Sequence, residues 1–360
     1  MNGSRMTHHQ DIRRVGVILG GRSSEREVSL ASGRQVYMNL DRARWTGLPL
    51  FMDGGGRLWA LPEKLVYQNT CADIESRLAS DAERVAWESL PERVDLVFIA
   101  LHGKYGDDGC IQGALELLDL PYTGSGVLAC ALAQDKPMAH AVLEEAGLGA
   151  PRERVVTRAA FAADPLAVQA ALVDEPGLPL VVLPAREGSS IGVSVVREAE
   201  ALPTALATAF EWDDRALVEE FLDGMEFSVI VLEDEAGRPA PLLPTETVSE
   251  SPFLTYDDKY MPGRSQKITP ARVDEATLAR IQDAAAAVFR ALGFRGYARL
   301  DGFLLPDGRL LFTDPNPTSG MSPSSFLFHQ AAEAGMTAGM VVDRILDAAL
   351  RAHAHKRGPL

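Results

Sequence analysis

The sequence predicts an α/β protein with more than one domain. The chain has 360 residues, which exceeds the length of one typical domain, so two or three domains are expected. In its first third, short apolar strands alternate with helical segments, as is typical of a parallel, doubly wound sheet. Further along, strands, a long amphipathic helix and a β-hairpin follow without an internal repeat. A parallel N-terminal domain followed by further α and β units is therefore predicted.

The N-terminal elements follow from apolar runs and helix signals. Residues 15–19 predict a short strand that ends at two glycines. Ser24-Glu25-Arg26-Glu27 has the form of a capping box and predicts a helix to about residue 40. A second strand over 94–101 enters His102-Gly103, and a helix over 111–118 follows it.

The remaining elements follow from the same signals. In order, we expect a helix over 131–146, strands over 180–183, 217–220 and 227–232, a helix over 274–292, the hairpin, and a helix over 336–350. The predicted domains cover residues 13–130, 131–216 and 217–352.

The hairpin over 299–316 is the most informative segment. Two apolar runs flank Asp307-Gly308, a strong short-range hairpin signal. If these two residues form the turn, Pro306 pairs with Arg309. Asp301 then lies opposite Asp314, Arg299 lies opposite Asn316, and all four side chains share one face of the hairpin.

This register predicts a metal site. Two carboxylates directly across a strand pair lie about 5 Å apart at Cβ and repel each other. A divalent cation between them would remove that cost, and the oxygens of Asp301, Asp314 and Asn316 suit Mg²⁺. A solvated hairpin face with incidental acids is the alternative.

Composition limits the classes of function. The net charge of −15 argues against a nucleic-acid binder. No run of 18 apolar residues is present, so no transmembrane helix is expected, and the polar start has no apolar stretch typical of a secretory signal. The three cysteines lack metal-site spacing and are typical of a reducing cytoplasm.

Other polar residues lie at the ends of predicted strands and helices, where either a ligand-binding role or a structural role would explain them. The loop over 186–192 can approach phosphates closely, although many such loops are plain connectors. Lys136 stands near a helix start, where a cation opposes the helix dipole, so a phosphate partner or simple solvation would explain it. His102 follows a strand end, where ligands bind in parallel sheets, or is satisfied by loop carbonyls. Glu25 suits either a helix first turn or an ammonium ligand.

A strand end over 219–222, followed by Glu226, is compatible with a nucleoside-binding edge. Backbone donors and acceptors there would read the base. An ordinary strand end has the same appearance.

Together these segments resemble the D-alanine–D-alanine ligases of the ATP-grasp superfamily from about residue 15 to residue 350. Seven ordered segments carry the resemblance: 20–30 (GGRSSEREVSL), 101–109 (LHGKYGDDG), 121–126 (PYTGSG), 186–194 (REGSSIGVS), 258–260 (DKY), 295–301 (RGYARLD) and 320–325 (GMSPSS). The resemblance implies an N-terminal domain plus two α+β domains that clasp ATP.

The resemblance also implies a reaction and roles for residues. The γ-phosphoryl group of ATP would pass to the carboxylate of one D-alanine, and the amine of a second D-alanine would displace phosphate. The metal ligands, for Mg²⁺ or Mn²⁺, would be Asp301, Asp314 and Asn316. ATP would contact Lys136, Glu219, Phe221, Leu222 and Glu226. Catalytic roles would fall to Glu25, Ser189, Tyr260, Arg299 and Gly320, and substrate contacts to His102, Lys259, Ser325 and Phe326.

Several positions depart from the family pattern, among them Pro315 and Pro317, which flank Asn316 unusually. Leu183 replaces the usual lysine before Pro184, and one charge-assisted hydrogen bond contributes roughly 1.5–3 kcal/mol, so nucleotide affinity or rate would fall by about ten- to a hundredfold. Asp314 replaces the usual Glu. Phe326 stands where Leu is common and would reshape the pocket for the second amino acid.

Three interpretations therefore remain open. The first is a D-alanine–D-alanine ligase for peptidoglycan precursors, and Tyr260 in place of Phe favours peptide over ester formation. The second is a paralogue that joins other amino acids. The third is a nucleotide- or peptide-binding homologue with impaired catalysis, which Leu183 motivates. The resemblance also implies a homodimer.

Overall fold

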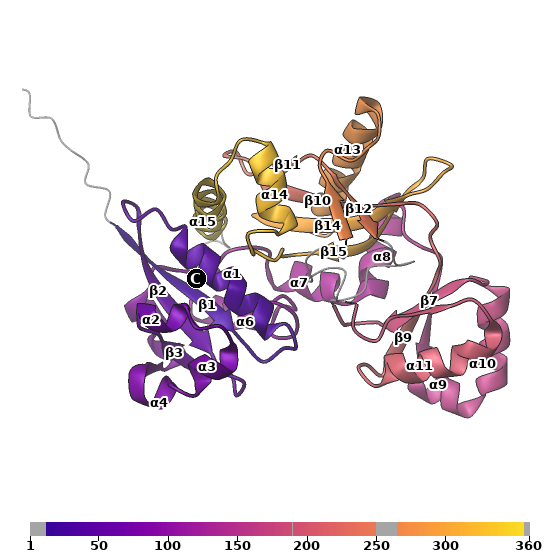
Figure 1. Ribbon diagram of the computed structural model, residues 1–360, viewed down its shortest axis with the longest axis horizontal. Coiled ribbons are helices and arrows are strands. Elements are labelled where there is room, and N and C mark those ends of the chain that lie inside the picture. The colour runs from indigo at the N-terminus through magenta and orange to yellow at the C-terminus, as the bar shows by residue number, and fades with distance from the viewer. Residues whose placement is uncertain (1–11, 189, 250–264, 356–360) are drawn as a thin grey trace, which may run out of the picture.

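The computed structural model describes residues 12–188, 190–249 and 265–355, in which three β-sheets follow one another along the chain. Figure 1 shows the N-terminal sheet in indigo and purple, the central sheet in pink, and the C-terminal sheet in orange. This arrangement agrees with an α/β fold of three units. The domain limits of 13–130, 131–216 and 217–352 remain predictions.

The N-terminal sheet is parallel at its centre but mixed overall. Its order is β4-β3-β2-β1-β5, in which β1 pairs in parallel with β2 and β5, while β3 and β4 add antiparallel neighbours. The sequence predicted a wholly parallel sheet, and this prediction is wrong at the edge formed by β3 and β4. The strands are β1 (Arg13–Gly20), β2 (Trp45–Met52), β3 (Leu58–Ala60), β4 (Glu83–Val85) and β5 (Leu96–Ile99). The helices of this unit are α1 (Arg26–Met38), α2 (Glu63–Val66), α3 (Cys71–Glu75), α4 (Leu78–Asp81), α5 (Leu90–Arg93) and α6 (Cys110–Leu117).

The central sheet is antiparallel, with the order β6-β9-β7-β8. Helices cover it and form a separate small core with it. The strands are β6 (Glu153–Thr157), β7 (Leu180–Pro184), β8 (Ser194–Val196) and β9 (Arg215–Glu220), and the helices are α9 (Arg158–Ala163), α10 (Pro165–Asp174) and α11 (Leu202–Phe210).

The C-terminal sheet is antiparallel and has the order β13-β12-β10-β14-β15, with β11 beside β10. Its strands are β10 (Met225–Glu233), β11 (Pro239–Pro241), β12 (Thr245–Ser249), β13 (Ser265–Ile268), β14 (Tyr297–Leu304) and β15 (Leu310–Asn316). The helices α13 (Glu275–Ala291), α14 (Phe326–Glu333) and α15 (Ala338–Ala354) complete this unit.

Two cores bury opposite faces of the C-terminal sheet. Phe227, Val229 and Val231 of β10 pack with α13 and with the helices that precede β6. The alternate residues Ile230 and Leu232 belong to a core that also includes β1, α1, α14 and α15. This alternation follows the two-residue period of a strand. The N- and C-terminal units therefore share one core, whereas the central unit has its own.

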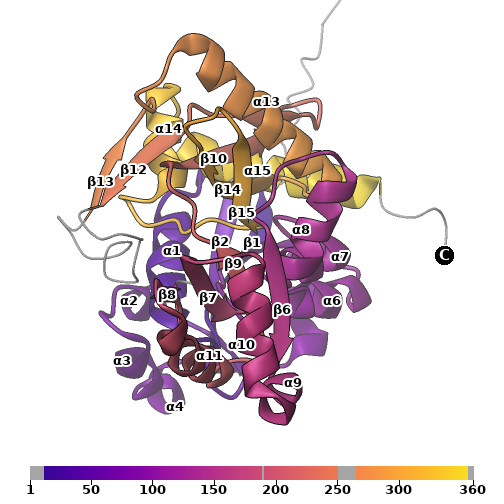
Figure 2. The same ribbon diagram turned by 90° about the vertical axis from the view of Figure 1, so that its right-hand side faces the viewer.

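The helix predicted over 131–146 is two helices, α7 (Val127–Gln134) and α8 (Lys136–Glu145), which Figure 2 shows beside α6. The backbone turns at Asp135, which has φ −95° and ψ 90°. Pro137 stands in the first turn of α8, where its missing N–H costs nothing. The Lys136 N–H donates instead to the Ala185 carbonyl, at 3.2 Å, in the loop after β7.

The predicted capping box at the start of α1 does not form. The N-cap residue is Glu25, and no side chain caps the helix. The Ser23 hydroxyl instead accepts from the Glu25 N–H and donates to the His102 carbonyl, at 3.2 and 2.5 Å. The start of α1 is thus fixed to the loop after β5.

Within the described residues, no helix is long and apolar enough to cross a membrane.

Candidate active site

Two adjoining cavities lie between the units. The first, about 420 Å³, lies between the central and C-terminal sheets and is called the inter-sheet cavity. The second, about 410 Å³, is lined by all three units and is called the central cavity. Six residues line both and form a shared wall: Lys136, Glu187, Gly188, Glu226, Thr247 and Asp314.

The inter-sheet cavity has apolar sides and many acidic groups. Its apolar lining includes Val181, Leu183, Ile191, Val193, Phe221, Leu222 and Phe303. Seven acidic residues also line it: Glu187, Glu219, Glu220, Asp223, Glu226, Glu246 and Asp314. Apolar surfaces beside fixed polar groups are typical of a small-molecule site. The five residues predicted to contact ATP all line this cavity.

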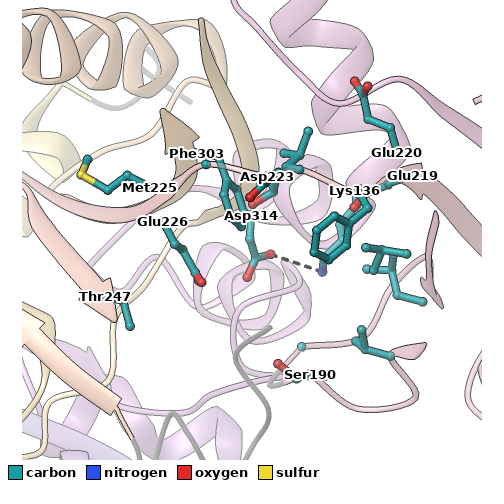
Figure 3. Close-up of a pocket in the computed structure, with 18 of the residues that line it drawn as sticks. Lys136, Ser190, Glu219, Glu220, Asp223, Met225, Glu226, Thr247, Phe303 and Asp314 are labelled. Atoms are coloured by element: carbon teal, nitrogen blue, oxygen red, sulfur yellow. Dashed lines mark ion pairs between the residues drawn. The ribbon is translucent and has the colours of Figure 1, made fainter. Parts of the chain in front are cut away.

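Lys136 lies where the two cavities meet. It is buried at the first position of α8, and its Nζ donates to the Glu187 carbonyl at 2.7 Å. The same Nζ lies 3.3 Å from Asp314 Oδ1, and Figure 3 shows this pair. These partners explain a cation at a helix start, where the dipole alone is unfavourable. Lys136 is therefore not a solvated surface lysine.

The hairpin formed by β14 and β15 has the predicted pairing at the site but a different turn. Arg299 pairs with Asn316 and Asp301 with Asp314, as the sequence predicted. At the turn, however, the Leu305 N–H donates to the Arg309 carbonyl, so three residues form the loop and the pairing of Pro306 with Arg309 is wrong. A register shift between Asp301 and Gly302 restores the predicted register.

The carboxylate of Asp301 has several donors around it. Arg299 Nε lies 3.1 and 3.0 Å from its two oxygens, and the Ser228 hydroxyl donates to Oδ1 at 2.7 Å. Arg299 beside Asp301 and Lys136 beside Asp314 already offset part of the repulsion between the two acids. Asp301, Asp314 and Asn316 all line the central cavity. The two carboxylates are hard donors that suit Mg²⁺. Asn316 Nδ2 donates to the Asp314 carbonyl at 2.9 Å and lies 3.4 Å from Asp301 Oδ2, so its amide would have to turn to offer the oxygen to a cation.

Glu25 lies in the central cavity beside two loops. A Cβ at Gly103 would lie 2.5 Å from Glu25 Oε2, and a Cβ at Gly188 would lie 3.5 Å from the same oxygen. Gly103 also has φ +69°, a conformation that favours glycine. The α1 start, the loop after β5 and the loop after β7 thus meet at one carboxylate.

His102 is a buried, neutral side chain of the central cavity. Burial, and then the charge of Arg299, lower the pKa of His102 to about 4. Its Nε2 shares a hydrogen bond of 2.9 Å with the Ser32 hydroxyl, which also accepts from the Met321 N–H at 3.0 Å. A neutral imidazole can donate one hydrogen bond but brings no charge to a ligand.

Gly320, Ser325 and Phe326 line the central cavity from the C-terminal unit. Ser325 is the N-cap of α14, where its hydroxyl accepts from the Phe328 N–H at 3.3 Å. Lys267 Nζ lies 4.3 Å from the centre of the Phe326 ring and donates to the Ser324 carbonyl at 2.9 Å. Three further predicted site residues, Ser189, Lys259 and Tyr260, lie outside the described residues.

Several residues at the site escaped the sequence reasoning. Ser228 faces Asp301 because β10 pairs with β14, a long-range pairing that no local signal predicts. Lys267 reaches Phe326 from β13 for a similar reason. Asp107, in contrast, stands inside the 101–109 segment, so a signal existed. Its Oδ2 accepts from the Gly103 N–H and the Thr318 hydroxyl, at 3.0 and 3.3 Å.

Asp107 is a half-buried acid of the central cavity. Its Oδ1 is buried and has no hydrogen-bond partner. Burial, followed by the charge of Glu25, raises the pKa of Asp107 to about 8. A neutral carboxyl group is therefore expected beside Glu25 at pH 7.

Leu183 packs as an apolar wall residue. It forms a small cluster with Ala185 and Leu217, and it lines the inter-sheet cavity. Of the two lysines that the family resemblance implies at the start of α8 and in β7, this chain keeps only Lys136.

Comparison with known proteins identifies the family. Residues 14–125 match the family described as "D-ala D-ala ligase N-terminus", and residues 142–347 match "D-ala D-ala ligase C-terminus". The D-alanine–D-alanine ligase of Pelotomaculum thermopropionicum is 37% identical over 94% of this chain and 96% of its own length. That of Geobacter sulfurreducens is also 37% identical, over 92% and 93%.

Solved structures have the same fold. The VanG D-Ala:D-Ser ligase from Enterococcus faecalis superposes with a TM-score of 0.83 at 29% identity, over 94% of this chain and 99% of its own. The D-alanine–D-alanine ligase of Coxiella burnetii gives 0.81 at 24% identity, over 96% of both chains. With both family segments matched in order along nearly the whole sequence, this chain belongs to the D-alanine–D-alanine ligase family, a family of ATP-grasp enzymes.

Proposed function

We propose that this enzyme joins two D-alanine molecules into D-alanyl-D-alanine for peptidoglycan precursors and converts ATP to ADP and phosphate. One observation carries the proposal: the inter-sheet and central cavities meet at Lys136, Glu226 and Asp314. A nucleotide in the first cavity would therefore present its terminal phosphate to a substrate in the second.

The inter-sheet cavity is the proposed ATP site. Phe221 and Leu222 would hold the base between apolar surfaces, with Glu219 at its polar edge. Glu226 would accept from the ribose. Lys136 would contact phosphate oxygens at the junction, where its charge neutralises the group to be transferred.

The hairpin is the proposed metal site. Asp301, Asp314 and Asn316 would hold Mg²⁺ or Mn²⁺, which supplies charge neutralisation on the phosphate oxygens when bound. Arg299 lies among these residues and would place a guanidinium beside the same charge.

The central cavity is the proposed amino-acid site. Glu25 would bind the ammonium group of the first D-alanine, and neutral His102 would donate a hydrogen bond near its carboxylate. Ser325 would bind the carboxylate of the second D-alanine, with Phe326 beside it. The proposed roles of Ser189, Lys259 and Tyr260, in closing loops and contacting substrates, rest on the sequence alone.

The proposed chemistry has two steps. A carboxylate oxygen of the first D-alanine attacks the γ-phosphorus of ATP, ADP leaves, and an acyl phosphate forms. The amine of the second D-alanine then attacks the acyl carbon, the C–N bond forms, and phosphate leaves as the amine loses its proton. Arg299 and the Gly320 N–H would stabilise the oxyanion of this second step.

Phosphate release from Mg-ATP, with and without D-alanine, tests the proposal when the product is identified by mass. Release that depends on D-alanine, with D-alanyl-D-alanine as product, supports it. Release only when another amino acid is added contradicts it in favour of a paralogue that joins other substrates. Nucleotide binding without release under any condition favours an impaired homologue.

A second candidate differs only in the second substrate. The Phe326 ring with Lys267 above it forms one wall of the central cavity beside Ser325. A polar second amino acid, such as D-serine, would find a cation there. Competition between D-alanine and D-serine for incorporation at the second position distinguishes the two candidates. A homodimeric, cytoplasmic enzyme remains the expectation from the sequence.

A further inference from the structure

Lys267 contributes an ammonium group to the wall of the central cavity. Its strand, β13, stands at one end of the strand order of the C-terminal sheet and pairs with β12, where Lys267 lies opposite Thr247. Both residues line the cavity. Because directly opposite residues point to the same face of a sheet, this pairing brings the lysine to the cavity. The side chain is half-buried there.

Two contacts hold the ammonium group in place. Nζ lies 4.3 Å from the ring centre of Phe326, a cation–π contact, and it donates to the Ser324 carbonyl at 2.9 Å. An ammonium group has three N–H donors, and this carbonyl takes one of them. Neither contact supplies a negative charge. Within the part of the chain that the structure describes, no carboxylate forms an ion pair with Lys267.

The other two cations of the central cavity have acidic partners. Lys136 Nζ lies 3.3 Å from Asp314, and Arg299 lies 3.0 Å from Asp301. Burial, and then the charge of Arg299, lower the pKa of Lys267, while Asp301 opposes this change. A half-buried cation without an anion is unfavourable, so an anionic group of a ligand would be favoured beside it.

A hydroxyl group and a carboxylate would use this ammonium group differently. The hydroxyl of D-serine would accept a hydrogen bond but leave the charge of Lys267 unpaired, whereas a carboxylate would accept the bond and neutralise the charge. In the proposed function, Ser325 binds the α-carboxylate of the second amino acid, and Phe326 lies beside it. The ammonium group over the Phe326 ring would therefore meet the side chain of that amino acid.

We propose that Lys267 is a specificity-determining residue that admits a D-amino acid with a side-chain carboxylate, D-aspartate or D-glutamate, as the second substrate. The inference deepens the proposed function, since it rests on acyl phosphate formation from a first D-alanine. The amine of the acidic amino acid attacks the acyl carbon, the C–N bond forms, and phosphate leaves as the amine loses its proton. The side-chain carboxylate forms no covalent bond and pairs with Lys267.

The test measures which amino acid enters the second position. The enzyme receives Mg-ATP, D-alanine and one competitor: D-aspartate, D-glutamate, or the matching amide D-asparagine or D-glutamine. Mass analysis of the mixed dipeptides gives the ratio of kcat/KM values. Lys267→Met removes the charge at similar length, and Lys267→Arg restores a cation. Lys64→Met, at an exposed lysine of α2, is the control for the loss of one positive charge.

The wild type and Lys64→Met should incorporate the acids at least about tenfold better than the amides. Lys267→Met should lose about ten- to a hundredfold in kcat/KM for the acids, because a charged hydrogen bond is lost, and should keep its kcat/KM for D-alanine. Lys267→Arg should recover most of the preference. An unchanged ratio of acid to amide in Lys267→Met would overturn the proposal. Equal losses for acids, amides and D-alanine would mean a packing or α-carboxylate role and would also overturn it.

Three further results separate this inference from the proposed function. If Lys267→Met does not fold, Lys267→Gln keeps a polar side chain without the charge, and the same loss is expected. D-alanyl-D-alanine as the only product of the wild type would refute the inference and leave the proposed function intact. Joining of D-alanine to D-aspartate without any D-alanyl-D-alanine would contradict the proposed function and support the inference.

Discussion

Asp301 lies directly opposite Asp314 across β14 and β15, at the last pair before the ladder shifts register. Their partners come from different elements. Asp314 lies beside Lys136 of α8, whereas Asp301 contacts Arg299 of its own strand and Ser228 of β10. Asp314 thus stands where both cavities meet, and Asp301 lies beside it in the central cavity.

Removing one of these acids should weaken metal binding. Asp314→Asn keeps the size but loses the charge, so activity should fall by about a hundredfold at low Mg²⁺ and recover partly as Mg²⁺ rises. Phosphate release over a Mg²⁺ titration measures this. Asp314→Glu is the matched control and should keep most activity. An unchanged Mg²⁺ requirement in Asp314→Asn would exclude Asp314 as a ligand.

A lysine at position 183 should strengthen nucleotide binding at some cost to the free protein. Leu183→Lys places a cation on the wall of the inter-sheet cavity, so KM for ATP should fall by about ten- to a hundredfold. Because Leu183 packs with Ala185 and Leu217, the unliganded variant should melt at a lower temperature than the wild type.

Leu183→Met is the uncharged control for that substitution and should change neither KM nor its salt dependence. Steady-state kinetics at two salt concentrations, with melting curves with and without ATP, give the comparison. A lower KM in both variants would point to shape rather than charge.

Glu25 should be displaced by a side chain at Gly103. In Gly103→Ala, the new Cβ would lie 2.5 Å from Glu25 Oε2, so KM for D-alanine should rise at least about tenfold. Gly147→Ala is the matched control, since Gly147 has φ +71° and nothing within 4 Å of its Cβ. Both variants should lose about 1 kcal/mol of stability from backbone strain. A rise in KM in both would mean that strain, not contact with Glu25, is responsible.

Asp107 should make stability depend on pH. The pKa of Asp107 rises from about 3.8 unfolded to about 8 folded, so its stabilising contribution is complete below pH 3.8 and is lost as pH rises through 8. Asp107→Asn cannot ionise at this position. The free energy of unfolding of the variant, relative to that of the wild type, should therefore increase between pH 4 and pH 8. Urea unfolding at several pH values measures the difference.

Asp53→Asn provides a comparison of opposite sign. Burial raises the pKa of Asp53, but hydrogen bonds from Trp59 and Arg57 outweigh it and lower the pKa. The free energy of unfolding of the wild type, relative to that of Asp53→Asn, should therefore increase as the pH rises toward 3.8, the pKa of Asp53 in the unfolded chain. Parallel pH profiles for the Asp107 and Asp53 variants would contradict the assignment.

The sequence predicted the site register because two errors compensate. A two-residue turn was inferred from Asp307-Gly308, but Gly308 has φ +86° and ends a three-residue loop. The shift beside Gly302 then moves the strands back by one residue. Local turn chemistry is readable from sequence, whereas a bulge depends on contacts such as the close approach of Gly302 to Leu311.

Long-range pairing explains what the sequence missed. Residues 131–146 have continuous helical character, yet the chain turns at Asp135, where the ion pair with Arg215 and the bond from Lys136 to Ala185 require it. Lys267 was overlooked because its place at the central cavity depends on the pairing of β12 with β13. Of the cavity residues that were identified, Glu25, His102 and Arg299 stand in segments with recognisable motifs, whereas Glu219 and Glu226 followed only from the family resemblance.

The wall shared by the two cavities offers a route by which their ligands would be coupled thermodynamically. A nucleotide bound at Lys136 or Glu226 would change the surroundings that an amino acid in the central cavity meets. By linkage, the factor by which D-alanine changes the affinity for ATP must equal the factor by which ATP changes the affinity for D-alanine. Cooperative occupancy is therefore a property expected of this wall, whichever ligand arrives first.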